Sequence, residues 1–126
     1  MGKIYVSNYS CRKKEILENA LKVQISMSKP DGFAVHVNWK RVAPQWNGLL
    51  GPHKRGEIDD EEYTRRYERD YLYRYRDEIV NEMNWLVRKA AGHDIVLFCW
   101  CGQDKFCHRF ILQRFLNENG FVVERL

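Results

Sequence analysis

The segment from residue 99 to residue 109 concentrates side chains that could do chemistry. Cysteines stand at positions 99, 101 and 107, and the last of them begins the triplet Cys107-His108-Arg109. Sulfur and imidazole are ligands that zinc prefers, a thiolate is a strong nucleophile, and basic side chains hold phosphate or carboxylate groups. The segment therefore fits three kinds of site: a metal site, a thiol active site and an anion-binding site.

A metal site would use all the sulfur and imidazole groups of the segment. Its ligands would be Cys99, Cys101, Cys107 and His108, and its ion would be zinc. The spacing departs from the common zinc motifs, in which a longer gap separates paired cysteines, and an adjacent Cys and His rarely converge on one ion. We therefore expect no cofactor, with zinc as the one alternative.

A thiol active site would use Cys107 and His108 as its catalytic residues, if the protein is an enzyme. The two residues are expected in the first turn of a helix, where the pKa of a thiol tends to fall. Neighbouring side chains on a helix point about 100° apart, so His108 is expected to be a poor base for Cys107. The spacing from Cys101 to Arg109 is also too long for a phosphatase-type loop.

An anion site needs only basic side chains and backbone amides at a helix start, which Lys105 and Arg109 would supply. The alternative is structural: a free cysteine such as Cys99 is commonly a small core residue, and His108 would pack or cap.

Further candidates stand at the end of the first strand and in the long loop. The complete set of ligand-binding candidates is Ser7, Asn8, Trp39, Arg41, Cys99, Cys101, Lys105, Cys107, His108 and Arg109.

Hydrophobic periodicity predicts the elements that position these residues. Residues 94–100 are apolar on both faces, which is typical of a central strand covered by two layers. The predicted strands are 3–7, 23–28, 33–37, 94–100 and 121–124, and the predicted helices are 12–22, 59–91 and 107–119. A bend is expected at residues 76–78. This alternation predicts an α/β fold, a single three-layer domain with a small, largely parallel sheet flanked by helices. Ligands of such sheets bind beyond the carboxyl ends of the strands.

Residues 29–57 hold all three prolines and are predicted to form a long, mostly irregular loop. The loop carries two basic clusters, residues 39–41 and 53–55, which could close over an anionic ligand. The helix that follows has tyrosines at four-residue spacing, at positions 63, 67, 71 and 75, with arginines between them. Packed tyrosines with salt-paired arginines are the more common outcome, and stacking on bases is the alternative.

The composition excludes several classes of protein. A chain of 126 residues with 30% charged positions is long enough for one compact domain, and no segment is apolar over the length that a membrane helix needs. The start lacks a secretory signal, so we expect a cytoplasmic protein with free thiols. A net charge of +4 favours anionic partners weakly, so nucleic acid is an option that is not favoured. A homo-oligomer also remains open.

Several segments together resemble the domain of unknown function 488 family over most of the chain. They are Lys3-Ile4-Tyr5, Gln24-Ile25-Ser26, Val42-Ala43-Pro44, Gly56-Glu57-Ile58, Tyr63-Thr64 with Tyr67, Cys99, Cys107-His108-Arg109, Gly120-Phe121 and Val123-Glu124. The resemblance implies an α/β fold and a pocket that involves Cys99, Cys107, His108 and Arg109, but no settled reaction. It also implies an acidic residue where this chain has Cys101, a departure that weakens any mechanism requiring a carboxylate there.

The leading hypothesis is therefore a protein that binds a small anionic, nucleotide-like ligand at the strand ends. Arg109, Lys105 and His108 would hold its charge, and Trp39 or a tyrosine would stack on it. The alternatives are an enzyme that acts on nucleotide or nucleic-acid substrates through Cys107 and His108, and an interaction module that a metal ion staples.

Overall fold

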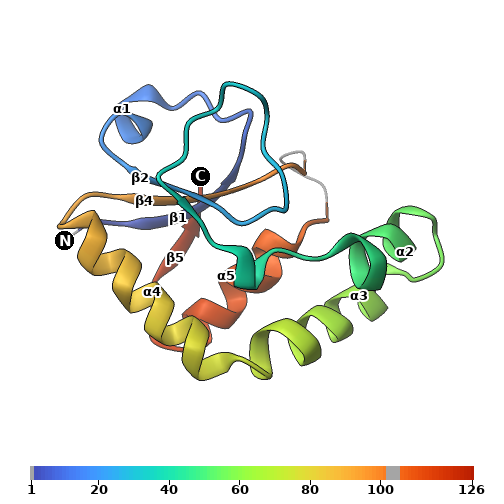
Figure 1. Cartoon of the computed structure of the whole chain (residues 1–126). Helices are drawn as coiled ribbons and strands as arrows, with labels where there is room; N and C mark the ends of the chain where they lie inside the picture. The colour runs from blue at the N-terminus through green and yellow to red at the C-terminus, as the bar shows by residue number, and fades with distance from the viewer. Residues whose placement is uncertain (1, 102–105) are drawn as a thin grey trace.

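The sheet is the centre of the molecule. The computed structural model describes residues 2–101 and 106–126. Five strands form one sheet in the order β3-β2-β4-β1-β5, and all neighbouring strands are parallel (Figure 1). Their bounds are β1 Ile4–Asn8, β2 Leu21–Gln24, β3 Val37–Asn38, β4 Ile95–Cys99 and β5 Val123–Arg125. The predicted α/β class with a parallel sheet is confirmed.

Strand β4 lies in the middle of the sheet, and all five of its residues are buried. Its apolar sequence on both faces explains this position, because each face packs against a separate hydrophobic cluster. The register places Asn8 of β1 beside Cys99 of β4. The carboxyl ends of the central strands therefore meet at one edge, where a ligand site was expected.

Helices cover one face of the sheet (Figure 1). They are α3 (Asp60–Tyr67), α4 (Arg76–Ala90) and α5 (His108–Glu118), with the π-helical segment η3 (Glu68–Tyr73) between the first two. Leu86 of α4 and Leu112 of α5 pack with Val6 and Leu97 of the sheet in the larger core cluster. Burial of such side chains is worth about 1.5–3 kcal/mol each. This layer fixes the position from which α5 presents its first turn.

The other face has a thinner cover, which consists of the single-turn helix α1 (Lys14–Leu17) and the loop that contains Phe33. Tyr9, Phe33 and Phe98 form an aromatic cluster there, with ring centroids 5.0–5.7 Å apart. The predicted third layer is therefore present, although it contains little helix.

Three predicted boundaries differ from the structure. The helix expected at 12–22 is only α1, and the strand expected at 23–28 begins earlier, because Leu21 joins the sheet through its amide and the Asp94 carbonyl. Pairing with a central strand overrides local helix propensity here. The long helix is interrupted at Tyr75 (φ −116°, ψ 30°), just before the bend expected at 76–78.

The predicted loop 29–57 contains more structure than expected. The strand predicted at 33–37 is wrong over most of its length, because β3 (Val37–Asn38) shares only Val37 with it. Three short helical segments come next, η1 (Lys40–Val42), η2 (Trp46–Leu50) and α2 (Gly51–Lys54). Pro52 is compatible with α2 because it stands in the first turn, where a helix needs no amide donor. These segments bring the second basic cluster against α3 and the cysteines.

The tyrosine-rich helix follows the common packing pattern. Tyr63 and Tyr67 are buried, and Arg65 and Arg66 both bond to Glu62.

In the part of the chain that the structure describes, no helix has the length and apolarity to cross a bilayer.

Candidate thiol site

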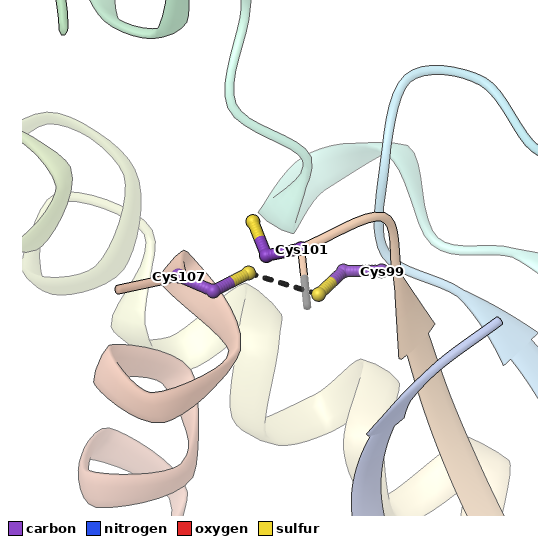
Figure 2. A group of neighbouring side chains, drawn as sticks. All are labelled: Cys99, Cys101 and Cys107. Carbon is purple, nitrogen blue, oxygen red and sulfur yellow. Dashed lines mark hydrogen bonds between the residues drawn. The ribbon is translucent and has the colours of Figure 1, made fainter. Parts of the chain in front are cut away.

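Three cysteines converge where β4 ends and α5 begins (Figure 2). The Sγ atoms of Cys99, Cys101 and Cys107 all lie within 4.8 Å of one another, and those of Cys99 and Cys107 are 2.9 Å apart. Side chains alternate along an extended chain, so Cys99 and Cys101, two residues apart, point to the same side. Trp100 lies on the other side, where its indole N–H donates to the Ser28 carbonyl.

The backbone of Cys107 explains how its thiol reaches the cluster. Cys107 is the N-cap of α5 and is extended (φ −155°, ψ 148°), so it lies outside the helix in which it was predicted. Its Sγ is 3.5 Å from Nδ1 of His108. The prediction that helical geometry would separate these side chains is therefore wrong, because only His108 is helical.

His108 is buried and has a defined proton position. Its Nε2 lies 2.7 Å from the Ile25 carbonyl oxygen, which can only accept, so Nε2 carries the hydrogen. Burial is the main cause that lowers the pKa of His108 to about 4, so the ring is neutral at pH 7. Its lone pair at Nδ1 then faces the Cys107 thiol and can accept a proton from it.

Arg109 places a permanent positive charge against the sulfurs. Only 2% of the residue is exposed, and Nη1 donates to Cys99 Sγ at 3.1 Å and to the Cys101 carbonyl at 3.0 Å. A guanidinium stays protonated in proteins and stabilises a nearby thiolate. The first turn of α5 adds the positive end of the helix dipole.

Contacts among the three thiols shift their pKa values in opposite directions. The hydrogen bond from Cys107, followed by that from Cys99, lowers the pKa of Cys101. Burial raises the pKa of Cys107, and the hydrogen bond with Cys101 raises the pKa of Cys99 to about 11. Cys101, the least buried of the three, is therefore the thiol that loses its proton most readily.

A pocket of about 430 Å³ opens over this cluster. Its walls come from η2, α2 and α3, from the carboxyl end of β4 and from the amino end of α5. The lining residues are Leu50, His53, Lys54, Tyr63, Trp100, Cys101, Phe106, Cys107 and His108. We call it the thiol pocket. His53 is held by Asp60, whose carboxylate lies 2.7 Å from Nε2. Lys54 has no carboxylate partner among the described residues, so its ammonium charge is available to a ligand.

The structure divides the sequence-predicted residues among several places. Cys101, Cys107 and His108 line the thiol pocket, and Cys99 lies buried beneath it. Lys105 falls outside the described residues.

Ser7, Asn8 and Arg109 line a separate pocket of about 390 Å³. Arg109 therefore contributes to that pocket and also contacts the sulfurs.

Trp39 and Arg41 lie in neither pocket. The Trp39 indole and the Arg41 guanidinium both donate to the Glu82 carboxylate on α4, at 2.8 and 2.9 Å. These bonds fix the segment after β3 to the helical layer. The structure does not bring either side chain to the cysteines.

The cluster can also hold a metal ion. Three sulfurs at these separations suit one zinc ion after a small adjustment, because sulfurs on tetrahedral zinc are about 3.8 Å apart. Within residues 2–101 and 106–126, the possible ligand atoms that lie within 4.8 Å of one another are the sulfurs of the three cysteines, and His108 is not part of this group. Three of the four proposed ligands are thus together.

Sequence analysis did not assign several residues of these pockets to a site. His53 and Lys54 were recognised only as a basic loop cluster, since no local pattern indicates that α2 folds against α5. Arg12, Lys13 and Arg125 were not singled out, although they line the second pocket. The only signal for them is their position beside predicted strand ends.

Comparison with known proteins gives one match. No curated protein and no solved structure matches the chain. A family model described as the Active DUF488-N3 subclade (DUF488-N3a) matches residues 4–120, which include strands β1 to β4 and the three cysteines of the cluster. The match covers nearly the entire chain, and the chain therefore belongs to the domain of unknown function 488 family.

Proposed function

We propose that the protein binds a small anionic, nucleotide-derived ligand in the thiol pocket. One observation carries the proposal: a concave site at the carboxyl edge of a parallel sheet is lined by the thiols of Cys101 and Cys107 and by Lys54, which has no carboxylate partner among the described residues. Pockets at this edge are the usual ligand sites of such sheets.

The pocket offers separate partners for the two parts of a nucleotide. The Lys54 ammonium can pair with a phosphate, since no carboxylate of the described chain neutralises it. Phe106 lies in the pocket wall, with its ring against those of His53 and Tyr63, and a base can stack in this aromatic group. Phe106 would take the role expected of Trp39, which the bond to Glu82 holds elsewhere.

Calorimetric titration of the whole protein with a panel of nucleoside mono- and diphosphates tests the proposal. We expect Lys54→Gln to weaken binding about tenfold, because a charge-assisted hydrogen bond is worth roughly 1.5–3 kcal/mol. Lys40→Gln is the matched control, since Lys40 is exposed and outside the pocket. Equal affinities of the two variants, or no binding by the natural protein, would refute the proposal.

A second candidate function, thiol catalysis on the bound ligand, is favoured by the placement of Cys101. Cys101 is the cluster member that both lines the pocket and has a lowered pKa. Its sulfur lone pair would form a bond to the phosphorus of a phosphoryl group, and the P–O bond to the leaving group would break. The leaving oxygen departs with the bonding electrons and takes a proton from water. A second water molecule then attacks phosphorus, and the S–P bond breaks with its electrons returning to sulfur. The proton of this water passes to the hydroxide left by the first, so phosphate is released and the thiolate is restored.

The description of the family as an active subclade supports the catalytic candidate. It predicts multiple turnovers on a phosphorylated nucleotide that Cys101→Ser abolishes, whereas Cys11→Ser, outside the cluster, leaves the rate unchanged. Stoichiometric binding without turnover would leave the binding function alone. The metal-stapled alternative predicts instead that a strong chelator unfolds the region around the cluster, which circular dichroism would detect.

A further inference from the structure

A second pocket lies at the carboxyl end of β1, next to the thiol cluster but separate from the thiol pocket. Its volume is about 390 Å³, and we call it the arginine pocket. The end of β1, the connection to α1, the first turn of α5 and the end of β5 form its walls. The lining residues are Val6, Ser7, Asn8, Ser10, Cys11, Arg12, Lys13, Arg109, Phe110, Arg125 and Leu126.

Positive side chains dominate this lining. Arg12, Lys13, Arg109 and Arg125 contribute four formal positive charges, and no aspartate or glutamate is among the described lining residues. Arg12, Lys13 and Arg125 form no ion pair with the described chain. Concave sites with one sign of charge focus the potential and concentrate counter-ions.

Several arginines elsewhere on the surface do have carboxylate partners. Arg65, Arg66 and Arg69 on the long helical segment all pair with neighbouring carboxylates. The positive charge of the arginine pocket is therefore left for a partner from outside.

Two of the guanidinium groups have fixed positions. The guanidinium carbons of Arg109 and Arg125 lie over the ring of Phe110 on α5. Their distances to the ring centroid are 4.3 Å for Arg109 and 3.9 Å for Arg125. A stacked guanidinium loses less freedom when a ligand binds, because the ring already restricts its orientation. Shared stacking on one ring places the charges from α5 and β5 together.

Hydrogen-bond donors complete the lining. The Asn8 side chain accepts from the Ser10 amide at 3.0 Å, which shapes the turn after β1. Ser7, at the end of β1, is buried, and Ser10 is exposed. Their hydroxyl groups can donate to phosphate oxygens, as the guanidinium groups do.

We propose that the arginine pocket is a binding site for a diphosphate group, either free or as part of a nucleoside diphosphate. The three cations without a carboxylate partner match the roughly three negative charges of a diphosphate at neutral pH. Arg109 adds a fourth donor while it also contacts Cys99. The site stands independently of whether a ligand occupies the thiol pocket.

Calorimetric titration of the full chain with inorganic pyrophosphate tests the proposal. We expect Lys13→Gln and Arg125→Gln each to raise the dissociation constant about tenfold, the loss of one charge-assisted contact. The matched control is Lys14→Gln, which removes the same charge one residue further along and outside the pocket. Its dissociation constant is expected to change less than about twofold, because an exposed charge beyond the pocket contributes little. Thermal unfolding of each variant checks that it is folded.

Two results would overturn the inference. They are an equal effect of Lys13→Gln and Lys14→Gln, and inorganic phosphate binding as tightly as pyrophosphate. The failure of the proposed function has a different signature, because nucleotide binding would then be insensitive to Lys54→Gln while pyrophosphate binding still depends on Lys13.

Discussion

Replacement of His108 by glutamine tests the proton arrangement on which the thiol site depends. His108 is neutral in the folded protein because it is buried and its Nε2–H is bonded to the Ile25 carbonyl. In the unfolded chain the imidazole is exposed and has an ordinary pKa. The two states therefore differ in proton uptake over a defined pH range, and His108→Gln, which keeps a donor for the carbonyl, removes this difference.

The size of the effect follows from the two pKa values. The folded pKa of about 4 lies below the ordinary histidine value of 6.5, so below pH 6.5 the unfolded state binds more protons and the stability falls as the pH falls. At about 1.36 kcal/mol per pKa unit, the loss is about 2 kcal/mol at pH 5 and about 3 kcal/mol below pH 4. Glu62, whose pKa Arg65 and Arg66 lower to about 2, titrates below this range.

Urea unfolding at pH 7.5 and pH 5.0 measures the loss. We expect the natural protein to lose about 2 kcal/mol between these two pH values, and His108→Gln to lose less than about 0.5 kcal/mol. His93→Gln is the control, because His93 is exposed, and this variant should behave like the natural protein. The same loss in His108→Gln as in the natural protein would refute the assignment of a buried, neutral His108.

Three further predictions concern other contacts. Iodoacetamide at pH 6 should alkylate Cys101 before the other thiols, as peptide mapping would show, because its pKa is lowered; preferential labelling of a buried sulfur would contradict this. Tyr67→Phe removes the 2.6 Å bond from the buried hydroxyl to the η1 backbone and should cost about 1–2 kcal/mol in urea unfolding, whereas an unchanged midpoint would mean that the bond contributes nothing. Glu82→Gln breaks the half-exposed ion pair with Arg41 and should cost less than about 1 kcal/mol, with nucleotide affinity unchanged in calorimetry; weaker binding would connect this pair to the ligand.

Much of the fold could be predicted from the sequence because the central elements have strong, consistent patterns. Strand β4 is apolar on both faces, and α5 has a regular buried stripe, so their types and approximate bounds were correct. The stretch 12–22 was misassigned because its residues favour a helix locally, while Leu21 gains more from burial beside β4.

The candidate site was only partly predictable. The convergence of Cys99 and Cys101 follows from strand alternation, which is local. The contact of Cys107 with His108 depends on an extended N-cap, and the position of Lys54 depends on how α2 packs against α3 and α5. The separation into two pockets follows from the direction of the Arg109 side chain, which a one-dimensional pattern does not specify.

The strand order has a consequence for biosynthesis. β1 and β2 do not pair with each other, and each bonds to β4, so Ile4 and Leu21 both meet Ile95. While a ribosome makes the chain from its amino end, the first two strands must wait with unpaired edges until residues 95–99 emerge from the exit tunnel. Such non-local pairing slows folding and leaves nascent strands open to misassociation. Cys99 lies on β4, the strand that joins β1 to β2. The thiol cluster can therefore form only after β4 has paired with both of them.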